Sequence, residues 1–130
     1  TQDFLTEMTN EIMAMGPYFR AVIDSLDFFM QREDPSRVVA MLRMMQAHTQ
    51  IHRGILFVTV SNDTITPAIK QEMAAIADMV CDFKVRTIGS DFETSMIVSK
   101  FRNAPENLSI MVYRVTPEEG ITPETVERIA

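Results

Sequence analysis

The sequence has 130 residues, a length that fits one compact domain, and 46% of them are hydrophobic, which is enough to build a core. A formal net charge of −6 excludes a general attraction to nucleic acid, although it does not exclude a local basic edge. No 18-residue apolar run predicts a membrane span, and no basic and apolar leader predicts secretion. The single cysteine, Cys81, cannot form a disulfide within the chain, so we expect a buried thiol in the reducing environment of the cytoplasm. From the length, we expect residues 1–130 to form one domain.

The glycines exclude the two common phosphate-binding loops. Gly16, Gly54, Gly89 and Gly120 lie far apart, and none is followed by lysine. The sequence therefore contains neither GxxxxGK[ST] nor GxGxxG, whose backbone amides cradle nucleotide phosphates. We expect the isolated chain to bind no nucleotide or other cofactor.

The first predicted elements are a helix and a strand that ends in an acidic residue. Apolar residues at helical spacing predict an amphipathic helix that ends at Gly16 and Pro17. Phe19–Asp24 is nearly continuous in apolar residues, which predicts a strand covered on both faces. Asp24 and Ser25 stand at its carboxyl end, where many α/β nucleotide-binding proteins hold magnesium. On this stretch alone, Asp24 is either such a ligand or the acid of an ordinary turn.

A loop over Asp27–Glu33 is expected to lead to a second helix. Asp34 supplies its N-cap, and the helix is predicted to run to about Arg53. His48 and His52 lie one turn apart on it, at a spacing that could place both on one metal ion. No HExxH glutamate or third ligand is near, so we expect surface histidines in the last helical turn.

A second buried strand is predicted over Ile55–Val60, and polar residues follow it directly. Ser61, Asn62 and Asp63 stand after its carboxyl end. This cluster is either a ligand-facing edge of an open α/β sheet or ordinary turn chemistry. A further helix opens at Thr66.

The C-terminal part of the sequence changes to the period of strands. Phe83–Arg86, Ser95–Phe101 and Leu108–Val115 are separated by short polar turns, which predicts an antiparallel meander of three strands. A closing helical turn is expected over Glu124–Ile129. The element order predicts an α/β fold with parallel core strands, an antiparallel C-terminal meander and helices on both faces of the sheet.

Two cations stand at the end of the predicted meander's second strand. Lys100 and Arg102 are two residues apart, so on a strand they project from the same face. At a sheet edge they could neutralise charge on a phosphoryl group held by a neighbouring subunit. They could equally belong to a solvated edge strand, where cations discourage edge-to-edge pairing.

The order of these elements resembles the C-terminal half of a RecA-like ATPase core, most closely that of the KaiC-like family of archaea and bacteria. VIDSL at Val22–Leu26 resembles the Walker B strand of that family, and the resemblance implies that Asp24, with Ser25 beside it, reaches magnesium through water. The strand tip at Ser61 and Asn62 resembles the tip that senses the γ-phosphate.

Two further motifs carry the same resemblance. IVSKFRN at Ile97–Asn103 is similar to the family's Lys-x-Arg strand, and a Gly-Ile pair at Gly120 is similar to the one that closes such domains. The resemblance implies that Lys100 and Arg102 act in trans on the nucleotide of a neighbouring subunit in a ring.

The chain departs from that family at one place. The Walker A loop, the strand before it and the acidic catalytic pair ahead of the Walker B strand have no counterpart in the sequence. ATP and magnesium are therefore expected only in a parent protein, and the 130 residues alone should not hydrolyse ATP. A sheet that lacks strands on one side should also self-associate through its exposed edge.

Two functions remain from these observations. The first is the C-terminal portion of a KaiC-like ATPase that couples nucleotide binding to signalling, ring assembly or DNA transactions. The alternative is a stand-alone, non-catalytic regulatory or protein-interaction module on a degenerate RecA-like scaffold. A receiver-like signalling domain is disfavoured, because the chain lacks the further acidic pair and the five βα repeats that such a domain needs.

Overall fold

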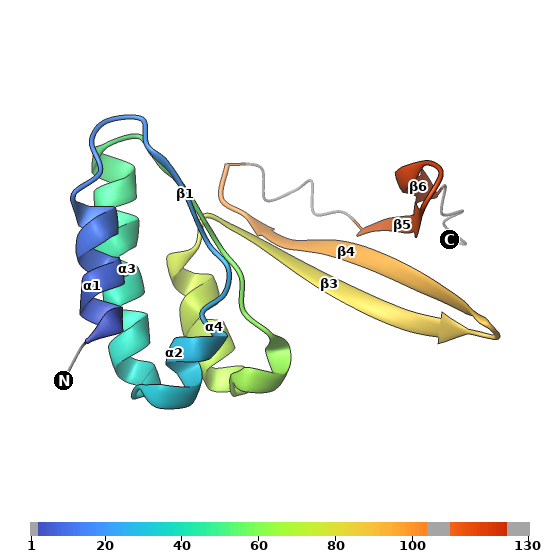
Figure 1. The fold of residues 1–130 in the computed structure, drawn as a ribbon, viewed down its shortest axis with the longest axis horizontal. Helices are drawn as coiled ribbons and strands as arrows, with labels where there is room; N and C mark the ends of the chain where they lie inside the picture. Colours follow the sequence, from blue (N-terminus) through green and yellow to red (C-terminus); the bar gives the residue numbers. More distant parts are fainter. Residues whose placement is uncertain (1–2, 104–109, 125–130) are drawn as a thin grey trace. The chain divides into compact units, whose positions relative to one another are not determined.

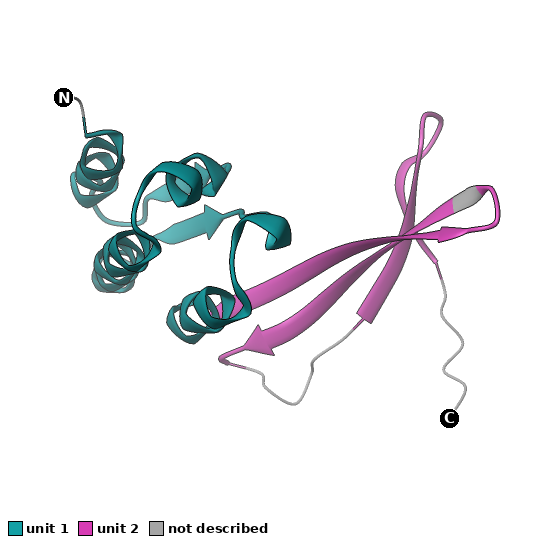
Figure 2. Cartoon of the chain, turned by 90° about the horizontal axis from the view of Figure 1, so that it is seen from below, with its two compact units in different colours: residues 1–77 teal, residues 78–130 magenta. Residues whose placement is uncertain are grey.

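The computed structural model describes residues 3–103 and 110–124 (Figure 1). The chain divides into two compact units, residues 1–77 and residues 78–130 (Figure 2). Unit 1 carries helices and a parallel pair of strands, whereas unit 2 carries an antiparallel sheet. The α/β class, with parallel strands followed by an antiparallel meander, is confirmed.

Unit 1 is built around two parallel strands that pair in register from Arg20 opposite Ile55 to Ile23 opposite Val58. Helix α3 packs against β2 and against the helices on either side of it. The elements of unit 1 are α1 (Phe4–Met13), β1 (Arg20–Ile23), α2 (Asp27–Arg32), α3 (Pro35–Ile51), β2 (Ile55–Val58), η1 (Asn62–Thr64) and α4 (Pro67–Ile76).

The core of unit 1 lies on one face of this strand pair. Ile23 on β1 points into it, because alternate strand residues face opposite sides. Val22 and Phe57 point the other way and are 67% and 63% exposed. The expectation that Phe19–Asp24 is covered on both faces is therefore wrong for its outer face in unit 1. The buried residues that form the core are Leu5, Ile12, Ile23, Leu26, Met30, Val38 and Met45.

Helix α3 begins as predicted and ends slightly earlier. The carboxylate of Asp34 accepts a hydrogen bond from the backbone N–H of Ser36 at 3.0 Å, which is the expected N-cap. The chain leaves the helix after Ile51, and Arg53 takes a positive φ of 53°. Gly54 follows, where a Cβ atom would lie 2.4 Å from the ring of Phe19. Glycine is required at this position because the ring occupies that space.

Helix α2 replaces the loop that was expected over Asp27–Glu33. Leu26 and Met30 stand one turn apart, and both are buried in the core of unit 1. The Arg32 guanidinium lies 4.0 Å from the centre of the Phe28 ring and covers the outer side of this short helix. A single turn of apolar spacing is too short to show in the sequence, so tertiary packing decides this element.

His48 is buried rather than on the surface, which corrects the expectation for that residue. Its Nε2 atom donates a hydrogen bond to the backbone carbonyl of Met15 at 2.9 Å. The imidazole also stacks between Phe19 and His52, with ring centres 5.6 and 4.2 Å away. The segment after α1 passes over the end of α3 and removes His48 from water. Among the described residues, no group of three or more His, Cys, Asp or Glu side chains could hold a metal ion.

The described residues of unit 2 form an antiparallel meander of four strands in the order β3, β4, β5, β6, one strand more than predicted. Residues 108–109 of the predicted third strand and residues 125–129 of the predicted closing helix lie outside the described part of the chain. The start expected for that helix, Glu124, is instead the end of β6. The strands are β3 (Met79–Ile88), β4 (Asp91–Phe101), β5 (Ile110–Thr116) and β6 (Gly120–Glu124).

The two faces of this meander differ in chemistry. Cross-strand partners share a face, so the register sorts the paired residues up to the irregularity between Val80 and Cys81. One face, which we call the charged face, carries the Arg86–Glu93 and Arg114–Glu124 ion pairs. The other, which we call the apolar face, has no charged side chain among the paired residues from Cys81 to Val98 and on the described parts of β5 and β6. Its largely exposed members are Phe83, Val85, Phe92, Met111, Val115 and Ile121.

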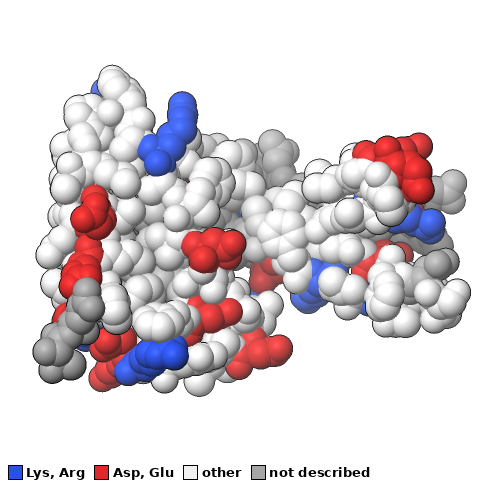
Figure 3. Space-filling model, viewed as in Figure 1, with Lys and Arg blue, Asp and Glu red and all other residues white. Residues whose placement is uncertain are grey.

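None of the helices in the described part of the chain is both long and apolar enough to cross a membrane. On the side of the molecule that Figure 3 shows, the basic side chains of the described residues are scattered and form no continuous patch. This side of the molecule therefore offers no broad basic surface, in line with the net charge of −6.

Candidate functional site at the carboxyl end of the parallel strands

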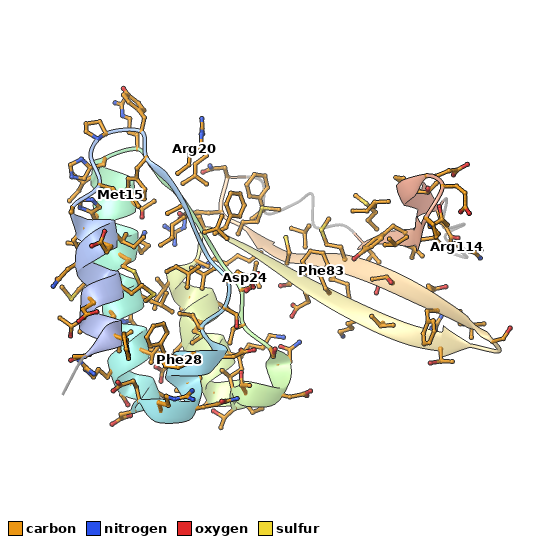
Figure 4. The ribbon with its side chains drawn as sticks, viewed as in Figure 1. Met15, Arg20, Asp24, Phe28, Phe83 and Arg114 are labelled. Atoms are coloured by element: carbon orange, nitrogen blue, oxygen red, sulfur yellow. The ribbon has the colours of Figure 1, made fainter. Side chains whose placement is uncertain are left out.

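Asp24 lies directly after β1, at the carboxyl end of the parallel pair (Figure 4). The hydroxyl of Thr59, which directly follows β2, donates a hydrogen bond to Asp24 Oδ1 at 2.7 Å. Two backbone bonds hold these strand ends together. The N–H of Thr59 donates to the carbonyl of Ile23 at 3.0 Å, and the N–H of Leu26 donates to the carbonyl of Thr59 at 2.9 Å. The Asp24 side chain is therefore fixed at the strand end but remains exposed.

Asp27, the first residue of α2, joins the two strand ends a second time. Its Oδ1 atom accepts hydrogen bonds from the backbone N–H of Ser61 at 2.8 Å and from the hydroxyl of Thr64 at 3.0 Å. Its Oδ2 atom accepts from the hydroxyl of Ser61 at 2.7 Å. These bonds lower the pKa of the Asp27 carboxyl below its usual value, and the bond from the Ser61 hydroxyl has the largest effect.

Sequence reasoning missed Asp27, which it placed in a loop. The signal that could have found it is the spacing of polar residues after the two strands. Asp27 follows Asp24 by three residues, and Ser61 and Thr64 follow the next strand. Because the carboxyl ends of parallel strands meet at one edge, these groups were candidates to pair.

The four residues predicted for nucleotide binding gather at this edge. Ser25 stands between Asp24 and Leu26, and its hydroxyl oxygen accepts a bond from the N–H of Asp27 at 3.3 Å. Ser61 is bound to Asp27, and Asn62 begins the η1 turn beside it. The prediction that Asp24, Ser25, Ser61 and Asn62 contact a ligand stays a prediction.

Lys100 and Arg102 belong to unit 2, whereas the strand-end site belongs to unit 1. Lys100 lies on β4 opposite Val80, beside an irregularity in the ladder. Arg102 follows β4, and its guanidinium forms an ion pair with Asp78 at 2.8 Å. Both partners of that pair are well exposed, so it is a weak interaction that another anion could replace.

The strand-end residues fit one kind of magnesium site. Magnesium keeps several waters and takes only one or two carboxylates when phosphates complete its shell. Asp24 offers one exposed carboxylate, oriented by Thr59, which could meet that need directly or through a water. The chain supplies no phosphate-binding loop, because its four glycines fit neither common pattern. The residues at this edge would therefore fit only a metal ion that brings its own phosphate ligands, and the chain's glycines form neither common loop for those phosphates.

Comparison with models of protein families shows which family the chain belongs to. Residues 1–113 match a family described as a family of unknown function, DUF7125. The chain belongs to this family. A comparison with curated protein sequences finds no match for this DUF7125 member.

Two solved structures resemble the DUF7125 chain over nearly all of its length. The flagellar accessory protein FlaH from Methanocaldococcus jannaschii has a TM-score of 0.69 and 18% identity, and the match covers 95% of this chain and 54% of FlaH. A KaiC-like protein from Pyrococcus horikoshii OT3 has a TM-score of 0.63 and 16% identity, with 94% and 53% covered. The predicted resemblance to the KaiC-like family is confirmed for the fold, and the chain spans about half the length of each structure.

Proposed function

We propose that this chain is the C-terminal, Walker B portion of a KaiC-like ATPase that acts in nucleotide-dependent signalling or assembly in the cytoplasm. The observation that supports it best is Asp24, exposed at the carboxyl end of β1 and oriented by Thr59. This is the edge of an open α/β sheet where ligands bind. The similarity of fold to about half of a KaiC-like protein also supports the proposal.

In this proposal, each candidate residue would have a separate role at the nucleotide. Asp24 would hold a magnesium ion through water, and the ion, when bound, would neutralise charge on the nucleotide phosphates. Thr59 would keep the carboxylate in place, and the tip of β2 would contact the terminal phosphate. Lys100 and Arg102 would reach the nucleotide of a neighbouring subunit. Without a phosphate-binding loop, the chain alone would not hydrolyse ATP.

We also propose that the chain self-associates, and that the apolar face of unit 2 is the contact surface. A sheet with one apolar face is stable only when that face is covered. Its six large side chains are each between 42% and 69% exposed, and exposed apolar surface of this kind marks interaction sites. Because these six side chains carry no charge, two copies can meet through them without repulsion.

Replacing Phe83 with serine should weaken this association, because Phe83 is 59% exposed on the apolar face. Lys84→Ser is the matched control, since Lys84 is the next residue on β3 and belongs to the charged face. Light scattering after size exclusion should give a dimer or larger oligomer for the wild type and Lys84→Ser, and a smaller species for Phe83→Ser. A monomeric wild type at about 100 μM, well above a micromolar Kd, would rule the contact out.

The natural gene tests the proposed function at little effort. We expect the reading frame to continue upstream of the Thr1 codon and to encode a GxxxxGK[ST] loop after a strand. A start codon immediately before Thr1 would refute the ATPase portion and favour the stand-alone module.

A further inference from the structure

We propose that Asp27 is the positioning residue of the strand-end site, and that it leaves Asn62 as the side chain that meets the terminal phosphate. The second half of this inference rests on the proposed function, whereas the first half can be tested without it. The juxtaposition that carries it is the Asp27 carboxylate of α2 against Ser61 and Thr64 at the tip of β2.

Asp27 holds the β2 tip by both of its oxygens. Oδ1 accepts from the Ser61 N–H and the Thr64 hydroxyl, and Oδ2 accepts from the Ser61 hydroxyl. Helix α2 and the η1 turn consequently lie in contact. Since α2 begins only three residues after Asp24, the same carboxylate ties the tip of β2 to the end of β1.

This arrangement needs an ionised carboxylate. Hydrogen bonds to a charged acceptor are shorter and about twice as strong as neutral ones. Asparagine has almost the same shape, but it offers a single acceptor oxygen and an NH2 group in place of the second. With asparagine at position 27, the amide oxygen could keep the Ser61 N–H and the NH2 group would donate to the Ser61 hydroxyl, which can turn to accept. The charge-assisted bonds would then become weaker neutral ones, and the tip would loosen without any loss of packing.

The hydrogen bonds from Ser61 and Thr64 to Asp27, which we call the Asp27 clamp, also give Ser61 and Asn62 different roles. The backbone N–H and the hydroxyl of Ser61 both donate to Asp27, so neither proton is available to a phosphate. Asn62 is the next residue, it is exposed, and its amide group can donate two hydrogen bonds. On the proposed function, Asn62 is therefore the neighbouring side chain with donors left for the terminal phosphate, and Asp27 holds Ser61, the residue before it.

The clamp should respond to acid in a defined direction. The pKa of Asp27 is lowered in the folded chain, first by the Ser61 hydroxyl bond. A lowered pKa means that the clamp stabilises the fold fully above the ordinary carboxyl pKa of about 3.9 and stops doing so as pH falls through the lower folded value. Neutralising the side chain should produce the loosened state at any pH.

Nuclear magnetic resonance on the full 130-residue chain tests the positioning. The Ser61 amide proton should lie downfield at pH 6 and move upfield in one titration with a midpoint below about 3.9. Asp27→Asn should abolish this titration, and Asp63→Asn, a change of an exposed acid on the η1 turn, should preserve it. A Ser61 amide that does not titrate in the wild type would overturn the proposal, and that arm needs no variant to fold.

Paramagnetic Mn²⁺ alone probes the consequence for the site. In the wild type it should broaden the amide resonances of Asp24 and Asn62 together. In Asp27→Asn the broadening at Asp24 should persist, and that at Asn62 should fall severalfold. Unchanged broadening at Asn62 would overturn the positioning role. If Mn²⁺ broadens neither residue while Ser61 still titrates, the metal site of the proposed function is refuted and the clamp of the β2 tip stands.

Discussion

Replacing Leu26 with alanine should lower the free energy of unfolding by roughly 3 kcal/mol, within the range of 2–5 kcal/mol for a buried leucine. Leu26 is 1% exposed and stands where the chain leaves the strand-end site and enters α2. Its backbone N–H donates to the carbonyl of Thr59 at 2.9 Å, and alanine keeps that bond. The loss therefore comes from the side chain and the cavity that it leaves in the core of unit 1.

Chemical denaturation of the chain measures this loss. Ile51→Ala is the matched control, because Ile51 also loses methyl groups but is 78% exposed at the end of α3. It should change the free energy of unfolding by less than about 0.5 kcal/mol. A loss below about 1 kcal/mol for Leu26→Ala would mean that the core is not packed around this residue.

Replacing Arg102 with alanine should lower kcat about 10³-fold in the assembled parent ATPase, with little effect on nucleotide binding. The expectation rests on the proposed function and on the size of the effect when an arginine that neutralises phosphoryl charge is removed. Arg102 follows β4, and its present partner is Asp78, at 2.8 Å in an exposed ion pair. Because such a pair is weak, a bound phosphate of a neighbouring subunit can displace Asp78.

Steady-state ATPase rates of the oligomer are the appropriate measurement. Lys100→Ala should also reduce the rate if the two cations act together. Arg86→Ala serves as the control, because Arg86 pairs with Glu93 on the charged face of the same meander. If the Arg102 and Lys100 variants turn over ATP as fast as the wild type, the role in trans is wrong.

Elements with strong local signals could be predicted from the sequence. Asp34 at the start of α3 and Thr66 at the start of α4 cap their helices as expected, because N-capping depends on a few neighbouring residues. The apolar runs that become β1 and β2 were also found, although the residues on their outer face are exposed in unit 1. Asp24 was found because it ends such a run.

The remainder depended on contacts between distant residues. Helix α2 is too short to be stable without the core, so its sequence reads as a loop. His48 is buried by a segment more than thirty residues earlier in the chain, and Asp27 gains its partners from residues beyond the next strand. The spacing of His48 and His52 gives no local sign that His48 is buried. A single acid at position 27 likewise gives no local sign of its hydrogen bonds to the tip of β2. Only the strand order, which brings β1 beside β2, makes the Asp27 clamp predictable.

Titration with ATP and magnesium tests the central claim, that this chain holds the metal side of a nucleotide site and lacks the phosphate side. The measurement compares the 130-residue chain with the complete natural gene product by calorimetry. We predict no binding in the micromolar range for the chain alone and clear binding for the complete product, because the chain has no GxxxxGK[ST] loop. Micromolar binding by the chain alone, or binding by neither protein, would contradict this account.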